Sequence, residues 1–177
     1  MNAEILKKGC SSLPYTLAHP LHGMITQAEK GNWSGAMNYM LDFFETSTMY
    51  LSIVLLAMLK ECEGIEECPE VMKAVGKIDN KRPLSFGDWS QDVLTPLAAA
   101  AAQRLSDNAF AQSLHKALTK DKVLIGKKNE RSVIKIRNEY KGHSTTRSMA
   151  IYQGIVDELS GRLEKFLEAL EPLGAME

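Results

Sequence analysis

The segment from Asn32 to Glu61 constrains the fold more than any other part of the chain. It reads NWSGAMNYMLDFFETSTMYLSIVLLAMLKE and has apolar residues on most sides of a helix. Such a helix must be covered by other elements, so we expect it to be the central helix of a bundle, capped by Asn32 or Ser34. Its longest apolar run, Met49 to Leu59, has eleven residues. That run is shorter than the roughly 20 residues needed to cross a bilayer, so we expect no membrane span.

The remaining segments also follow a helical pattern. Residues 13–31 predict one helix or two helical pieces, with Pro20 expected to break or kink it. Val123 to Ile125 is the only strand-like piece, and it is too short to form a sheet, so we interpret it as a loop. Further helices are predicted over residues 68–78, 84–106, 108–120 and 132–141, followed by a long last helix that Thr145 or Thr146 caps and that runs to about Leu170.

This pattern predicts an all-α helical bundle with a long C-terminal helix, formed by residues 1–177 as a single domain. The length suits one domain, and the content of 45% hydrophobic and 24% charged residues is typical of soluble globular proteins. The predicted core residues share the apolar side of the central and last helices: Phe44, Leu51, Leu55, Ile155, Leu159 and Phe166.

The cysteines and the N-terminus favour a cytoplasmic location. Cys10, Cys62 and Cys68 are odd in number and lack close pairing, which indicates free thiols in a reducing compartment. The N-terminal stretch MNAEILKKGCSSL has no apolar core of the kind that a secretory signal requires.

A net charge of -1 hides an uneven distribution of charge. From Lys116 to Arg147 there are ten Lys and Arg residues against three Asp and Glu residues. Such a segment can attract the phosphates of a nucleic acid, although a solvated helix face has the same composition. The residues that could follow an RNA backbone are Lys127, Lys128, Arg131, Lys135 and Lys141.

The stretch IRNEYKGHSTTR, residues 136–147, lies inside this basic segment. On a continuous helix Arg137 and His143 would point about 120° apart and lie about 9 Å apart along the axis. Gly142 can take the left-handed conformation that ends a helix and reverses the chain. His143 could then fold back toward Arg137 and Asn138.

These three side chains suit the cleavage of RNA. His143 can transfer a proton at neutral pH, Arg137 can bind phosphate oxygens, and Asn138 can orient a hydroxyl or phosphate. RNA carries its own nucleophile, the 2′-hydroxyl, so this chemistry needs no metal or other cofactor, and no metal-ligand spacing is visible. The alternative is structural: His143 caps a helix carbonyl and Arg137 pairs with a buried acid.

The stretch RNEYKGH resembles the motif of the HEPN (higher eukaryotes and prokaryotes nucleotide-binding) domain family. In that family an arginine with a polar follower is separated from a histidine by four to six intervening residues. Here Arg137 and Asn138 are the first two residues, and five residues lie between Arg137 and His143. The central helix is similar to the first core helix of such domains, with Glu45 as its acidic residue. The stretch PLSFGDW before an alanine-rich helix is also similar to bacterial members, and the resemblance covers residues 31–170.

The resemblance implies a bundle that forms a homodimer through its motif helices, with two Arg/His pairs in one cleft. Active members of the family are metal-independent endoribonucleases of toxin, antiphage or RNA-processing systems. Inactive members are dimerisation or sensor modules of bacterial defence or signalling proteins. An antitoxin or an additional domain is therefore a further expected partner. One variant of the family has a tyrosine two positions after the histidine, where this chain has Thr145.

Other residues carry weaker indications. Glu45 lies among apolar residues and needs a partner; we expect Arg137, which would make Glu45 an orienting residue, although a solvated edge is equally consistent. His19 and His22 are three positions apart. No Asp, Glu or Cys lies beside them in the sequence, so we do not expect a metal site there. Trp33 and Trp89 are expected to anchor the core or an interface.

Overall fold

The computed structural model describes residues 2–80, 82–141 and 147–175. All regular structure in these ranges is helical and none of it is a strand, so the predicted all-α fold is confirmed. The elements are α1 (Ala3–Ser12), α2 (Tyr15–Glu29), α3 (Trp33–Lys60), η1 (Ile65–Glu67), α4 (Pro69–Ile78), η2 (Asp88–Leu94), α5 (Thr95–Arg104), α6 (Ala109–Thr119), α7 (Val133–Tyr140), α8 (Met149–Leu170) and η3 (Glu171–Ala175).

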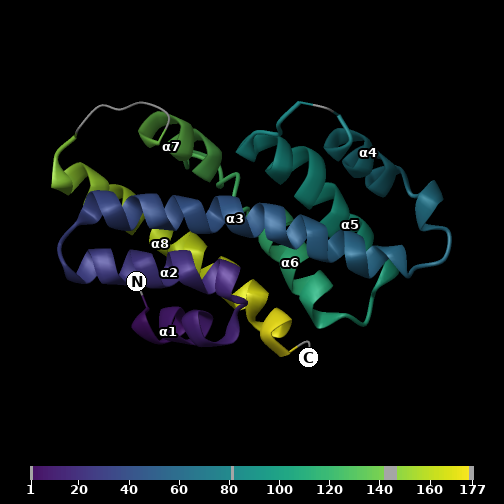
Figure 1. Cartoon of the computed structure of the whole chain (residues 1–177), viewed down its shortest axis with the longest axis horizontal. Helices are drawn as coiled ribbons and strands as arrows, with labels where there is room; N and C mark the ends of the chain where they lie inside the picture. Colours follow the sequence, from purple (N-terminus) through teal and green to yellow (C-terminus); the bar gives the residue numbers. More distant parts are fainter. Residues whose placement is uncertain (1, 81, 142–146, 176–177) are drawn as a thin grey trace.

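Helix α3 is the axis of the bundle, as its composition predicts. It starts at the N-cap Asn32, whose side chain accepts a hydrogen bond from the Gly35 amide at 3.1 Å. Figure 1 shows α2 running along one side of α3, α7 above its first half, and α5 beside its second half. Helix α8 packs against α3 from behind.

The centre of the core lies between α3 and α8. The Phe166 ring stacks on Phe44 at 5.8 Å between centroids and meets Phe43 edge-on at 6.1 Å. The six core residues predicted from the sequence are all at most 2% exposed.

Helix α3 is long and apolar enough to cross a membrane, and it alone has this property among the described residues. Half of the residues in its most apolar window are buried inside the bundle. Its position at the centre of the fold accounts for this composition.

Pro20 does not break the helix, since α2 continues through it from Tyr15 to Glu29. A proline inside a helix loses one backbone hydrogen bond and costs about 3 kcal/mol. Here Pro20 lies on the buried side of the helix, next to Leu17 and Leu21, both at 0% exposure. Packing against the core offsets the lost bond, which the local sequence does not reveal.

Helix α1 was not predicted, because its ten residues carry few apolar positions. Asn2 caps its start by accepting hydrogen bonds from the amides of Glu4 and Ile5. Its buried residues Leu6 and Gly9 lie on the side that packs against α2 and α8.

The helix predicted over residues 84–106, with its start expected near Ser85 or Gly87, begins at Phe86, directly after Ser85. Ser85 and Asp88 form a capping box: the Ser85 amide donates to the Asp88 carboxylate at 2.9 Å, and the Asp88 amide donates to Ser85 Oγ at 3.2 Å. The segment passes through the π-helical turn η2 before it continues as α5. The break expected at Ser106 and Asp107 separates α5 from α6.

The region around α7 follows the predictions in part. Val123 and Leu124 are buried in a loop, and the Val133 amide donates to the Leu124 carbonyl at 2.9 Å. Thr145 and Thr146, the expected caps of the last helix, lie outside the described residues, and the prediction is wrong because Ser148 holds the N-cap position. Helix α8 begins at Met149, with Ser148 as its N-cap residue.

Candidate functional site

Helix α7 holds the Arg-Asn motif against the central helix. Its N-cap Ser132 accepts a hydrogen bond from the Lys135 amide at 3.0 Å, and Val133 and Ile136 are fully buried. Arg137 and Lys141 are four positions apart, so they share one face of the helix. That face meets α3.

Arg137 forms a two-bond ion pair with Glu45 of α3. Its Nε donates to Glu45 Oε2 at 3.2 Å, and its Nη2 donates to Oε1 at 3.0 Å. The two side chains are 30% and 20% exposed, so the pair is partly shielded from water. The expected pairing of Glu45 with Arg137 is confirmed, and this geometry fixes the plane of the guanidinium.

The guanidinium of Arg137 keeps donors for a further group. Its Nη1 makes a long contact of 3.5 Å with Asn138 Oδ1. Of the five N–H groups of an arginine, three are engaged with residues in the described ranges. Within the described part of the chain the other two have no acceptor, and they lie beside the exposed amide of Asn138.

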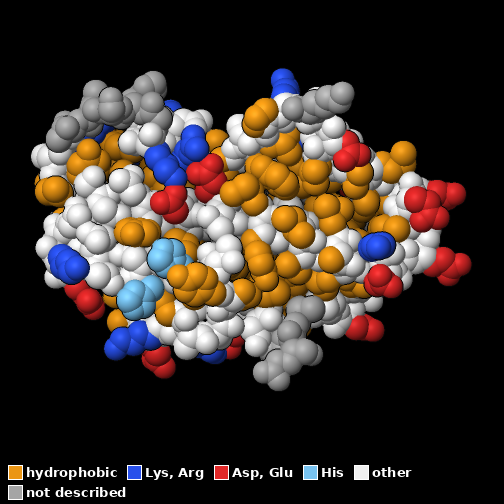
Figure 2. Space-filling view, viewed as in Figure 1, with side chains coloured by type: hydrophobic (Ala, Val, Ile, Leu, Met, Phe, Trp, Pro, Cys, Tyr) orange, Lys and Arg blue, Asp and Glu red, His pale blue; other side chains and the backbone are white. Residues whose placement is uncertain are grey.

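Lys141 extends the ion pair into a cluster. Its ammonium pairs with the Asp42 carboxylate and lies 3.6 Å from Glu45 Oε2. We call Asp42, Glu45, Arg137 and Lys141 the α3–α7 cluster. Its two positive and two negative charges balance, and Figure 2 shows basic and acidic side chains side by side at this place above α3.

His143, the third residue of the motif, lies outside the described residues. The chain enters its segment after Lys141 and leaves it at Arg147. The Arg147 guanidinium lies 4.4 Å above the centroid of the Tyr140 ring, and its backbone amide donates to the Tyr152 hydroxyl at 3.1 Å. Both residues that flank the segment are therefore held against α3, α7 or α8.

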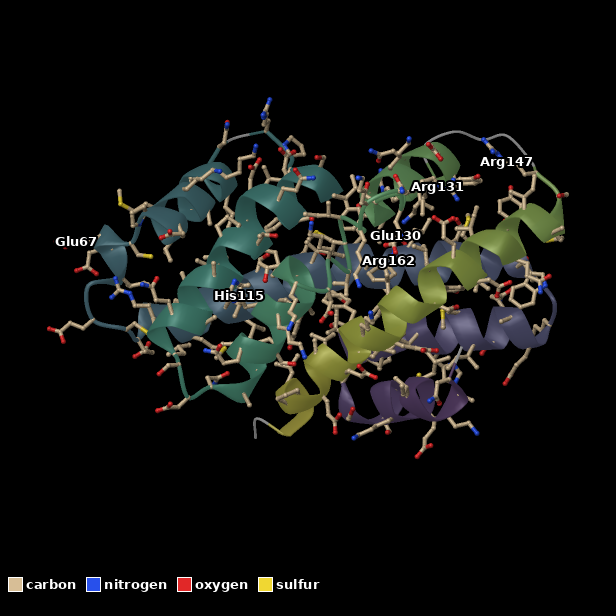
Figure 3. The ribbon with its side chains drawn as sticks, turned by 180° about the vertical axis from the view of Figure 1, so that it is seen from behind. Glu67, His115, Glu130, Arg131, Arg147 and Arg162 are labelled. Carbon is tan, nitrogen blue, oxygen red and sulfur yellow. The ribbon has the colours of Figure 1, made fainter. Side chains whose placement is uncertain are left out.

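Arg131 lies away from the α3–α7 cluster, on the side of α7 that faces α8. Figure 3 shows it near Glu130 and Arg162. Its guanidinium pairs with Glu158 of α8 through Nη2 and with Glu139 at 3.3 Å through Nη1. The hydrogen bond to Glu158 is the largest cause that raises the pKa of Arg131 above its ordinary value. A hydrogen bond with Tyr140 is the second cause and also raises it.

The other basic residues predicted to follow RNA are exposed. Lys127 and Lys128 lie in the loop between α6 and α7, and Lys135 lies on the outer face of α7, 4.0 Å from Glu139. The five residues therefore fall into different groups: Lys141 joins the α3–α7 cluster, and the others lie on the loop and the far side of α7.

Arg162 of α8 supports this loop and was not predicted from the sequence. It is 8% exposed, and its Nη2 donates to the Arg131 carbonyl at 2.7 Å. Burial lowers the pKa of Arg162. The backbone of Gly126 lies close to this guanidinium, since a Cβ at position 126 would lie 3.2 Å from Arg162 Nη1. Gly126 has a left-handed φ of 82°. A basic residue inside an apolar helix pattern is the only sequence signal for this role.

His19 has ring neighbours rather than metal ligands in the described structure. The ring lies 5.5 Å from Tyr15 and 6.5 Å from Tyr39, measured between centroids. No group of three or more His, Cys, Asp or Glu side chains in the described ranges could hold a metal ion. Trp33 and Trp89 pack as partly buried residues against the core.

Comparison of the chain with protein-family models, curated proteins and solved structures gives no match. A function for this bundle therefore rests on its motif and on the geometry of the α3–α7 cluster.

Proposed function

We propose that the protein is a HEPN-like RNA-binding domain that cleaves RNA without a metal, through Arg137, Asn138 and His143. The observation that carries the proposal is the pair of Arg137 and Glu45. It holds a guanidinium at a partly exposed position, in a fixed plane, with two donors that no described residue occupies and that suit phosphate oxygens. The resemblance to the HEPN motif adds His143 as the proton-transferring group.

The proposed reaction uses the 2′-hydroxyl of the RNA as nucleophile. The 2′-oxygen forms a bond to the adjacent phosphorus while the bond from phosphorus to the 5′-oxygen breaks. One proton leaves the 2′-hydroxyl and another joins the departing 5′-oxygen. His143 serves in proton transfer or in holding the phosphate, Arg137 stabilises the developing negative charge, and Asn138 orients the groups.

The active form that we propose is a two-fold homodimer. A single α7 offers few groups for this chemistry, and Asn138 and Lys135 are exposed on it. A two-fold axis beside α7 would place two copies of the motif in one cleft. Sedimentation should then show a dimer at micromolar protein concentration, whereas a monomer alone would contradict this form.

A non-catalytic dimerisation or sensor module is the second candidate. One observation favours it: the α3–α7 cluster is neutral, with each of its cations in contact with a carboxylate. Arg137 would then connect two helices, and an additional domain would supply the activity.

The deciding experiment is RNA cleavage in excess chelator. The purified protein should cut single-stranded RNA and leave 2′,3′-cyclic phosphate ends, while DNA, which lacks the 2′-hydroxyl, should survive. Arg137→Ala and His143→Ala should each lower the rate by about 10²–10³-fold. Arg82→Ala removes an exposed arginine away from the motif and should cut like the wild type. If the wild type leaves RNA intact, or if His143→Ala cuts equally well, the module becomes the better explanation.

A further inference from the structure

Three rings form a row on the surface shared by α2 and α3. Tyr15 and His19 are four positions apart on α2, so they lie on the same face, and Tyr39 comes from α3. The ring centroids of Tyr15 and His19 lie 5.5 Å apart, and those of His19 and Tyr39 lie 6.5 Å apart. Tyr15 is 79% exposed, the largest exposure among the exposed large apolar side chains in the described ranges. We call Tyr15, His19 and Tyr39 the aromatic row.

Gly23 fixes the inner end of the aromatic row. It continues the same face of α2, four positions after His19. A Cβ at this position would lie only 2.6 to 2.8 Å from three atoms of the Tyr39 ring. The ring therefore rests directly on the backbone of α2, and a larger residue at position 23 would displace it.

The aromatic row adjoins the α3–α7 cluster. Tyr39 precedes Asp42 by three positions on α3, so their Cβ atoms are roughly 5–6 Å apart. Asp42 pairs with Lys141, and Glu45, one turn further, pairs with Arg137. Figure 2 shows histidine side chains over α2 on the same face as the basic and acidic side chains above α3.

Rings and cations placed in this way match the two parts of a nucleotide. The phosphate of a single strand can reach the donors of Arg137, while an unpaired base has a flat face that stacks on tyrosine or histidine. The bases of a duplex are already stacked on one another and cannot do so. Tyr15 is 79% exposed, and the His19 ring beside it is tilted by 34° rather than stacked on it, which leaves ring surface of the tyrosine for a base.

We propose that the aromatic row is a base-stacking subsite that binds the unpaired bases of a single-stranded RNA beside Arg137. The subsite rests on the RNA binding proposed above, and it supplies the preference for single strands. Stacking tolerates any base, so the row selects for an unpaired strand rather than for a sequence.

The test measures binding separately from cleavage. A short 2′-O-methyl oligoribonucleotide cannot be cut, because its 2′-oxygen is blocked. Its binding to the intact protein is followed by fluorescence anisotropy at low salt. Tyr15→Ala should weaken binding about ten- to hundredfold, the range for loss of one base–aromatic stack. Tyr15→Phe keeps the ring and should bind like the wild type. Met72→Ala removes another exposed apolar side chain, 59% exposed on α4, and serves as the surface control.

A second strand with abasic positions separates stacking from phosphate binding. It should bind the wild type more weakly than the intact strand does, and it should bind the wild type and Tyr15→Ala equally. Loss of affinity in Tyr15→Ala on both strands alike would overturn the subsite, as would no loss on either strand. Absence of RNA binding by the wild type would overturn the subsite and the proposed function together. If the wild type binds RNA in a way that depends on the Tyr15 ring but does not cut RNA, the result would support the subsite and contradict only the proposed ribonuclease activity.

Discussion

Arg137 and Glu45 are 92 positions apart in the chain, and two hydrogen bonds join them across the boundary between α7 and α3. Helix α7 makes few other contacts with α3, so this pair is a main connection between the two helices. The same geometry fixes the guanidinium that we propose for catalysis. Arg137 therefore has a structural role beside the catalytic role that we propose for it, and a variant of Glu45 tests the structural role.

Glu45→Gln should lower the stability of the protein and should hold the guanidinium of Arg137 less firmly in its plane. The glutamine is of equal size, but it cannot accept two charge-assisted hydrogen bonds from the guanidinium. We expect a loss of about 1–2 kcal/mol in the free energy of unfolding, measured by denaturant titration. A double-mutant cycle with Arg137→Gln should give a coupling energy of similar size.

The control for this cycle is Glu29→Gln, which changes an exposed acid at the end of α2. It should leave the free energy of unfolding unchanged within about 0.5 kcal/mol. Additive effects of Glu45→Gln and Arg137→Gln would show that the pair contributes nothing to stability.

The basic residues of the loop and of α7 should differ in their effect on RNA binding. Lys128 is exposed, so Lys128→Ala should lower the dependence of log affinity on log salt by about 0.7, the value for one phosphate contact on a single strand. Arg131 is engaged by Glu139 and Glu158, so Arg131→Ala should leave this slope unchanged and destabilise the fold. A decrease of the slope in Arg131→Ala equal to that in Lys128→Ala would contradict this division.

Periodicity and caps predicted most of the fold. The central helix, the capping residue Asn32, the helix start directly after Ser85 and the break after α5 all follow from local chemistry. Two features depend on distant contacts and could not be read locally. Pro20 stays helical with its face buried against the core, and the short α1 packs its Leu6 and Gly9 side against α2 and α8.

The candidate site could be predicted only where the chemistry of a residue indicates which partner it needs. A buried carboxylate needs a partner, so the pair of Glu45 and Arg137 was one of the two expectations, and a solvated edge was the other. Whether a lysine forms an ion pair depends on which carboxylates the fold places beside it. The sequence alone therefore could not distinguish Lys141, which pairs with Asp42, from the exposed Lys128. The aromatic row joins two helices, and only their packing shows that Gly23 leaves room for Tyr39.

Two glycine substitutions should change stability in opposite directions. Gly126 has a φ of 82°, and an added Cβ would lie 3.2 Å from both the Arg131 carbonyl oxygen and Arg162 Nη1. Gly126→Ala should therefore cost about 1–2 kcal/mol or more in the free energy of unfolding. Gly154 lies inside α8 with open space around it, so Gly154→Ala should stabilise by about 0.5–1 kcal/mol. Equal effects of both substitutions would contradict the strained turn above Arg162.

The stability of the protein in acid should depend on Asp88. Lys77 on α4 pairs with its carboxylate at 2.7 Å, and Ser85 donates from both its hydroxyl and its amide. The hydrogen bond from Lys77 is the largest cause that holds the pKa of Asp88 well below its ordinary value, followed by those from Ser85. An aspartate in an unfolded chain has a pKa of about 3.9.

Between these two pKa values the unfolded chain binds a proton at Asp88 and the folded protein does not, so stability rises with pH in this window. The contribution of Asp88 is complete above a pH of about 4 and is lost as the pH falls toward the lower, folded pKa. Asp88→Asn cannot titrate, so its denaturation midpoint should fall less steeply in acid than that of the wild type. Asp107→Asn changes an exposed acid between α5 and α6 and should keep the wild-type slope. If Asp88→Asn and the wild type lose stability in parallel below pH 4, the capping carboxylate and its partner Lys77 do not govern the acid limb.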